Sequence, residues 1–340
     1  MSNINKNTAT IEHIGKTYGQ KNRDFNLPEL KSSLAERGIE VPERTLRRWL
    51  TQWVESNQLT RTGQKRGTRY YYLNPEVVTQ TPTFLHGIET NKRPAILAKL
   101  RDLWTHNSTA LEGNTLTLGD THAILELGLT ISGKPLREHH EIIGHAKAID
   151  LIYQISTEAL DKEKLFALHK AVQTEVVIDI YQPIGKWKVE KNYTNSITSE
   201  GKQVTIEYAD PRDIDALMTK LIETINHWKI DIITPENAHK SYAKIHLAFV
   251  HIHPFADGNG RLARLIANLP LLKAGLPPLL IDQTKRREYI TLLADYQSST
   301  PTPKLDKNSE HNFWPQAELI KPFSQFCADS YQSTNQLGTD

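Results

Sequence analysis

The spacing of hydrophobic residues changes several times along the chain, and each change predicts an element. Residues 26–38 predict a short helix that Asn26 caps and Gly38 ends. Residues 42–59 carry apolar side chains three and four positions apart, which predicts a second helix. Residues 59–75 predict two short strands around a glycine-containing turn. Helix, helix and hairpin in this order predict a winged helix-turn-helix domain over residues 1–75.

The rest of the chain is helical in pattern, with one exception. Residues 185–208 alternate polar and apolar positions and turn at Gly201, which predicts a β-hairpin. Residues 76–93 contain prolines and threonines without periodicity and predict a linker. The fold class is therefore mainly α: a helical bundle with one hairpin over residues 94–340, preceded by a small α+β domain. The helical spacing recurs near 96–104 and over 135–155, 161–173, 211–229, 235–252 and 260–275.

Charge is distributed unevenly between these two parts. Residues 1–75 hold 13 basic and 7 acidic residues, whereas the remainder holds 28 basic and 32 acidic residues. The predicted helix–hairpin surface carries Arg44, Arg47, Arg48, Lys65, Arg66 and Arg69. This pattern is expected of a helix that enters a DNA groove beside a wing. A solvated face or a protein–protein adaptor remains an equal alternative.

Three features bear on the compartment. The single cysteine, Cys327, excludes intrachain disulfides and favours a reducing cytosol. The first residues lack the apolar region of a secretory signal. No run of about 18 apolar residues occurs, so no membrane span is predicted. We therefore expect a cytoplasmic protein, and the sequence leaves a homodimer open.

The densest group of chemically useful side chains is HPFADGNGRLAR, residues 253–264. Pro254 should end the preceding helix, because the residue before a proline is pushed out of helical geometry. The stretch is thus predicted as a tight loop that leads into a second buried helix. The free N–H groups of a helix N-terminus, together with the Gly-Asn-Gly run at 258–260, predict a phosphate site. Arg261 and Arg264 would add charge-assisted bonds to it.

Two more side chains in this stretch suggest catalysis. Asp257 offers a hard oxygen ligand for the Mg²⁺ that accompanies phosphates. His253 is suited to take a proton near neutral pH. Together these groups predict nucleotidyl or phosphoryl transfer to a nucleophile. A metal site shared with His251 is disfavoured, because positions 251 and 253 diverge by roughly 200° on a helix.

The stretch resembles the signature of the Fic family, His-x-Phe-x-(Asp/Glu)-Gly-Asn-Gly-Arg-x-x-Arg, which it matches at every defined position. The resemblance extends over most of residues 94–300. Fic proteins mostly move the adenylyl group of ATP onto a Tyr, Thr or Ser hydroxyl of a protein. The resemblance therefore implies a protein adenylyltransferase (AMPylator) with ATP as co-substrate and an unidentified target protein.

The resemblance also implies a role for each motif residue. His253 would deprotonate the target hydroxyl, Asp257 would hold Mg²⁺, and Phe255 would anchor the loop in the core. The remaining roles concern the nucleotide: Gly258, Asn259 and Gly260 for phosphate oxygens, Arg261 for the β phosphate, Arg264 for the γ phosphate, and Tyr289 for the adenine pocket.

The predicted hairpin resembles the flap of the family, which aligns a target segment as an added strand. Ile197 is the candidate for the apolar clamp residue. The hairpin begins with Gly-Lys-Trp-Lys at 185–188, where the family often has Gly-x-Tyr-Arg. The contacts with the target are therefore less well specified than the nucleotide contacts.

A second stretch, STALEGN at 108–114, resembles the inhibitory motif of the family, (Ser/Thr)-x-x-x-Glu-(Gly/Asn). Ser108 and Glu112 are four residues apart and share a face of the helix expected near 94–113. A carboxylate brought to Arg264 would form a charge-assisted pair and occupy the guanidinium that the γ phosphate needs. The resemblance thus implies an autoinhibited enzyme.

Other functions remain open at this point. The same glutamate could serve removal of AMP from modified targets, or the body could be a sensing or dimerisation module of a DNA-binding regulator. Transfer of another group is a further alternative, although Gly260 argues against the kinase-like relatives that carry lysine there.

Overall fold

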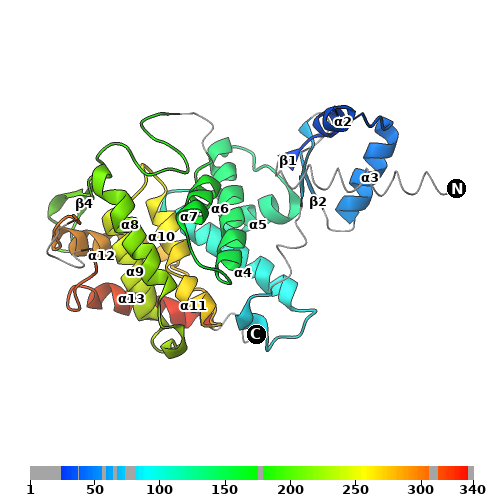
Figure 1. Ribbon diagram of the computed structural model, residues 1–340. Helices are drawn as coiled ribbons and strands as arrows, with labels where there is room; N and C mark the ends of the chain where they lie inside the picture. The colour runs from blue at the N-terminus through cyan, green and yellow to red at the C-terminus, as the bar shows by residue number, and fades with distance from the viewer. Residues whose placement is uncertain are drawn as a thin grey trace. The chain divides into compact units, whose positions relative to one another are not determined.

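The computed structural model describes residues 24–36, 38–55, 59–63, 67–72, 81–174, 179–305 and 313–335. The chain divides into two compact units (Figure 1). The first comprises residues 1–81 with 126–129, and the second comprises residues 82–125 and 130–340. Within the described ranges, no helix combines the length and apolarity needed to cross a lipid bilayer.

The first unit contains the predicted order of helix, helix and hairpin. Its elements are β1 (Asp24–Phe25), α2 (Leu27–Ala35), α3 (Glu43–Glu55), β2 (Leu59–Thr62) and β3 (Arg69–Tyr72). The strands form an antiparallel sheet in the order β1-β3-β2, in which β1 was not predicted. Asn26 and Glu29 cap α2 reciprocally, each side chain accepting the other's backbone N–H.

The α3 face opposite the core of this unit is basic. Arg44, Arg47 and Arg48 are exposed, while Trp49 and Trp53 are buried. The predicted wing residues Lys65 and Arg66 lie outside the described residues. The winged-helix assignment and DNA binding through residues 1–75 therefore stay predictions.

The second unit is a helical bundle with one hairpin, as predicted. Its helices are α4 (Arg93–Leu111), α5 (Leu118–Leu127), α6 (Leu136–Ile155), α7 (Lys162–Val172), α8 (Pro211–Asn226), α9 (Ala238–Ile252), α10 (Asn259–Ile266), α11 (Leu269–Lys273), α12 (Arg286–Ser298) and α13 (Lys321–Asn335). Three 3-10 turns, η2 (Thr83–Leu85), η3 (Ile230–Ile232) and η4 (Gln283–Lys285), join them.

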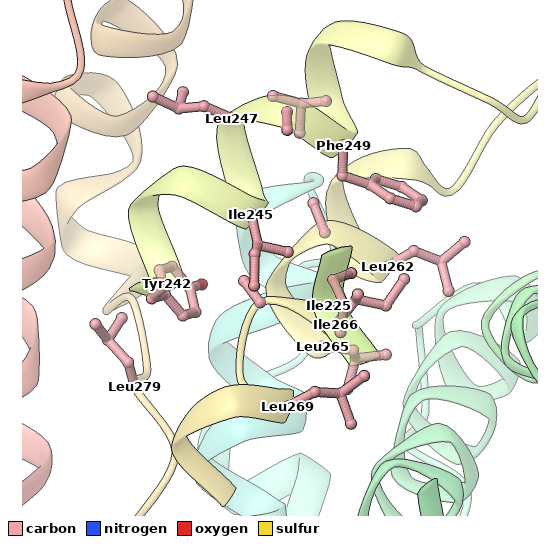
Figure 2. Close-up of a cluster of buried hydrophobic side chains, with 14 of the residues drawn as sticks. Ile225, Tyr242, Ile245, Leu247, Phe249, Leu262, Leu265, Ile266, Leu269 and Leu279 are labelled. Atoms are coloured by element: carbon pink, nitrogen blue, oxygen red, sulfur yellow. The ribbon is translucent and has the colours of Figure 1, made fainter. Parts of the chain in front are cut away.

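Helix α9 is the centre of this bundle. It packs against α8, α10, α11 and α13, and its C-terminal half, residues 245–252, is buried on every side. Figure 2 shows Ile245 and Phe249 of α9 near Leu262, Leu265 and Ile266 of α10. Burial of such side chains stabilises the fold by roughly 1.5–3 kcal/mol each. The loop between α9 and α10 is therefore held between two well-packed helices.

The structure departs from the predicted elements in two places. The helix expected over 260–275 is two helices, because Asn268 bonds the Arg264 carbonyl and both backbone groups of Leu279, and α11 then begins next to Pro270. Residues 82–93, expected as part of a linker, belong to the second unit, where Leu85 is buried. Helices α5, α12 and α13 were not predicted.

The hairpin consists of β4 (Tyr193–Ile197) and β5 (Gln203–Glu207), which pair from Tyr193 opposite Glu207 to Ile197 opposite Gln203. The turn falls at Gly201, whose φ of 78° is a left-handed conformation that glycine adopts without strain. Both strands contact α12. The predicted hairpin is therefore present, with shorter strands than the alternating pattern indicated.

Candidate active site

The motif loop, residues 253–258, is closed by its own side chains. The Asn259 side chain accepts the Phe255 N–H at 3.0 Å and donates to the Phe255 carbonyl at 2.8 Å. The Phe255 ring is fully buried. The loop is thus a rigid turn, and the Asn259 side chain uses its oxygen and one of its two N–H donors within it. The predicted phosphate contact of Asn259 stays a prediction.

The loop ends at the N-terminus of α10. Gly258 caps this helix with φ 80°, and the first bond into the helix is from the Leu262 N–H to the Gly258 carbonyl. The N–H groups of the first three helical residues, 259–261, therefore have no acceptor within α10. Free N–H groups and the helix dipole together favour an anion at this point.

His253 stands on the other side of the loop with a defined tautomer. It ends α9 directly before Pro254, where the proline rule places the end of a helix, but its φ of 56° is left-handed and not the extended conformation that the rule favours. Its Nδ1 lies 3.2 Å from the Val250 carbonyl, which can only accept, so the proton sits on Nδ1. Its Nε2 then carries a lone pair. Burial and the charge of Lys188 lower the pKa of His253 to about 3, which keeps the ring neutral.

The His253 ring is stacked on Tyr208, with ring centroids 3.7 Å apart and planes 10° from parallel. Tyr208 follows β5 directly, so the hairpin supports the imidazole. The only sequence feature that pointed to this contact was the place of Tyr208 at the end of the alternating pattern.

Asp257 is an accessible carboxylate. Its side chain is 55% exposed and lies 3.7 Å from Arg261 Nη2. Burial alone would raise the pKa of Asp257, but Arg261, the Gly258 N–H and the Gln173 amide hold it below its usual value. Asp257 is therefore ionised at neutral pH and able to bind a cation.

The two arginines of the motif are held by different elements. Arg261 is buried and donates to the Val172 carbonyl at 2.9 Å and to Gln173 Oε1 at 3.1 Å, at the end of α7. Arg264 turns instead toward α4 and α12. The predicted contact of Arg261 with a β phosphate stays a prediction, and it would require these bonds to be shared or exchanged.

Arg264 is a buried cation with four hydrogen bonds. It donates to Ser108 Oγ at 3.0 Å, the Ser108 carbonyl at 2.8 Å, Glu112 Oε1 at 2.7 Å and Tyr289 OH at 3.1 Å. Burial would lower the pKa of Arg264, but Tyr289 and Glu112 outweigh it and raise that pKa. The structure thus brings together Ser108, Glu112 and Arg264, as the family resemblance implied.

The Glu112 carboxylate also lies against the start of α10. A Cβ placed on Gly260 would overlap Glu112 Oε1. The carboxylate therefore lies against the backbone of Gly260, in the first turn of α10. Glycine at position 260 is what allows this approach.

Tyr289 lies beneath Arg264. It is 2% exposed, and its hydroxyl accepts from Arg264 and lies 3.0 Å from His246 Nε2. Burial raises the pKa of Tyr289 to about 12, so the hydroxyl stays protonated. Its contact with adenine stays a prediction; the structure gives Tyr289 the separate role of supporting Arg264.

Ile197 is at the end of β4 and is 54% exposed. This exposure leaves the side chain available for a partner, and its role as a clamp stays a prediction. Sequence reasoning missed four residues that touch the site: His169, Gln173, Lys188 and Tyr208.

Comparison with known proteins gives one consistent family. The Fic/DOC family pattern matches residues 159–271. The protein adenylyltransferase Fic of Drosophila erecta is 31% identical over 237 residues, which cover 68% of this chain and 40% of that protein. The protein adenylyltransferase fic-1 of Caenorhabditis briggsae is 30% identical over 201 residues, covering 56% and 36%. The chain thus spans about 40% of the length of the curated relatives it matches.

Solved structures share the fold. A Fic domain containing signaling protein from Bacteroides thetaiotaomicron superposes with a TM-score of 0.60 at 23% identity, covering 78% of this chain and 96% of that one. Fic-1 from C. elegans gives a TM-score of 0.58 at 24% identity, covering 78% and 70%. The chain therefore contains a Fic/DOC family domain at residues 159–271.

Proposed function

We propose that the protein is an autoinhibited adenylyltransferase that moves AMP from ATP to a Tyr, Thr or Ser hydroxyl of a target protein or of itself. The observation that carries this proposal is the neutral His253, whose free Nε2 stands at one end of the loop while Arg264 and the α10 N-terminus stand at the other. The adenylyltransferase relatives support the same reaction.

The reaction assigns one task to each group. His253 Nε2 takes the proton of the target hydroxyl, and that oxygen forms a bond to the α phosphorus. The bond from the α phosphorus to its bridging oxygen breaks, and diphosphate leaves with that electron pair. The N–H groups at the start of α10 and the guanidinium of Arg264 bind phosphate oxygens.

Asp257 would hold Mg²⁺. Among the described residues no group of three or more His, Cys, Asp and Glu side chains could hold a metal ion. One exposed, ionised carboxylate instead fits Mg²⁺, which keeps several waters and binds substrate phosphates. When bound, the ion neutralises charge on the phosphates.

Glu112 explains the autoinhibition. Its carboxylate is paired with Arg264 at 2.7 Å and lies against Gly260, so negative charge already occupies the place proposed for the γ phosphate. A phosphate at that place would overlap the Glu112 carboxylate and be repelled by its negative charge. Removal of this carboxylate should therefore free the site.

The test compares transfer of label from ATP to protein. We expect Glu112→Gly to raise incorporation from ATP labelled at the α phosphorus at least about tenfold. A tenfold rise corresponds to a decrease of about 1.4 kcal/mol in the activation free energy. Label at the γ phosphorus should not be transferred. Adding His253→Ala to Glu112→Gly should lower the rate by roughly 10²–10⁴-fold.

The control is the wild-type chain at equal concentration, with folding checked by circular dichroism. Transfer of the γ label would show phosphoryl transfer instead. Absence of any transfer by folded Glu112→Gly protein, to itself or to lysate proteins, would reject the proposed function.

A further inference from the structure

Three carbonyl groups of the motif loop are held from outside the loop. The Pro254 carbonyl accepts the Lys188 N–H at 2.9 Å, and the Phe255 carbonyl accepts Asn192 Nδ2 at 3.1 Å. The Asp257 carbonyl accepts from His169 Nε2 at 3.2 Å. Two of these donors belong to the stem of the hairpin, residues 185–192. The third belongs to α7.

His169 also binds the first residue of that stem. Its Nδ1 accepts the Gly185 N–H at 2.7 Å, while its Nε2 faces the Asp257 carbonyl. A backbone N–H can only donate and a carbonyl can only accept, so His169 is neutral with the proton on Nε2. The ring is 1% exposed and stacked on Phe255, with centroids 3.9 Å apart. One imidazole therefore joins the stem and the loop through three contacts.

Asn192 makes the second connection. The Lys188 ammonium, itself buried, donates to Asn192 Oδ1 at 2.6 Å. This bond fixes which end of the amide faces the loop, because Nδ2 must then point to the Phe255 carbonyl.

These contacts lie between the two parts that must cooperate in the proposed reaction. Strand β4, which would receive the target segment, begins at Tyr193, one residue after Asn192. His253 is the residue before Pro254, whose carbonyl the stem holds. The distance from a bound target strand to the base is therefore set through the stem and the loop together.

We propose that His169 and Asn192 are positioning residues for AMP transfer, which fix the hairpin stem on the motif loop so that a target hydroxyl and His253 stay aligned. This inference rests on the proposed function. It assigns no chemical step to either residue, because neither faces the reacting atoms. Their loss should affect turnover far more than nucleotide binding.

The test uses His169→Phe and Asn192→Leu, each in the Glu112→Gly chain. Phenylalanine keeps a ring against Phe255 and removes both hydrogen bonds of the imidazole. We expect kcat for AMP transfer to a target protein, or for self-modification, to fall roughly 10–100-fold, as misplacement of reacting groups produces. The KM for ATP should stay within about twofold, because Arg264 and the α10 N-terminus are untouched.

Two comparisons exclude a merely structural effect. His169→Gln keeps a donor near the Nε2 position, so we expect it to recover part of the lost kcat relative to His169→Phe. His227→Phe, at an exposed histidine after α8, should leave kcat unchanged. If His169→Phe does not fold, the kcat and the KM for ATP of Asn192→Leu and His169→Gln test the inference instead.

The outcomes separate the two proposals. No transfer by the Glu112→Gly parent would overturn the proposed function. Transfer by the parent with kcat within twofold in the folded position-169 and position-192 variants would overturn this inference alone. An equal rise in the KM for ATP with unchanged kcat would also overturn it, because that result would place the residues in nucleotide binding.

Discussion

Arg264 depends on several partners, and this determines what each single change can do. Ser108 supplies two acceptors and Tyr289 a third, so removal of Glu112 leaves the guanidinium oriented. Tyr289 accepts from Arg264, so its own proton is directed to His246. Ser108 and Tyr289 would therefore keep Arg264 in place for the proposed phosphate contact when Glu112 is removed.

Tyr289→Phe tests this support. It removes one acceptor of a charged donor while keeping the ring among its aromatic neighbours, so we expect a loss of about 1.5–3 kcal/mol in the free energy of unfolding, measured by urea titration. Tyr242→Phe is the matched control, because the Tyr242 hydroxyl is buried without a partner among the described residues. An equal loss in both variants would contradict the role given to Tyr289.

The partners of side chains were predictable only where both lie in motifs. The spacing of Ser108 and Glu112, taken with the family resemblance, predicted their meeting with Arg264. Arg261 was expected to face the same anion, and in the structure it donates to the carbonyl of Val172. This bond was not predictable, because every residue has a backbone carbonyl and the sequence does not indicate which one an arginine will bind. The use of Asn259 inside the loop was missed for the same reason.

At the scale of elements, the ends of α9 and α10 define the site. Pro254 and Gly258 act locally, so the sequence predicted both the end of one helix and the start of the next. The break between α10 and α11 was not predictable, because Asn268 bonds Leu279, eleven residues further on. Residues that end or start a helix can be recognised in the sequence, whereas hydrogen bonds across a loop depend on the tertiary structure.

The left-handed end of α9 gives a test of backbone strain. Position 253 has φ 56°, so His253→Gly should be more stable than His253→Ala by roughly 1 kcal/mol. The same pair at His251, inside the helix, should show the opposite order, because alanine favours a helix interior over glycine by about 1 kcal/mol. Urea titration of the four variants measures both differences. Greater stability of His253→Ala would contradict the left-handed conformation.

At the scale of the whole molecule, the second unit buries neutral imidazoles. Burial is the main cause of a lowered pKa in each of five histidines, to about 4 for His169 and His251 and about 3 for His253, and well below the ordinary value for His145 and His246. From the sequence, a metal site shared by His251 and His253 was disfavoured. Folding gives His246, His251 and His253 each a different partner, which only the tertiary arrangement decides.

These histidines should make the fold sensitive to acid. Below about pH 6.5 these histidines become protonated in the unfolded chain but stay neutral in the folded chain. Each one therefore lowers the free energy of unfolding by up to about 1.4 kcal/mol per pH unit, until the pH reaches its pKa in the folded state. Burial raises the pKa of Asp150 to about 6, and this single group opposes the trend below that pH. We expect the urea concentration at the unfolding midpoint, measured by helical circular dichroism, to decrease as the pH is lowered from 7.5 to 5.0. A constant midpoint would contradict the neutral state of these rings.

Because Glu112 and Arg264 belong to one chain, the frequency of their encounter does not depend on how much protein is present. Dilution cannot separate them, so under the proposed function a scarce protein would be restrained as firmly as an abundant one. A signal that relieved this restraint would then have to move the C-terminal turn of α4, where Glu112 lies, or displace the carboxylate from Arg264.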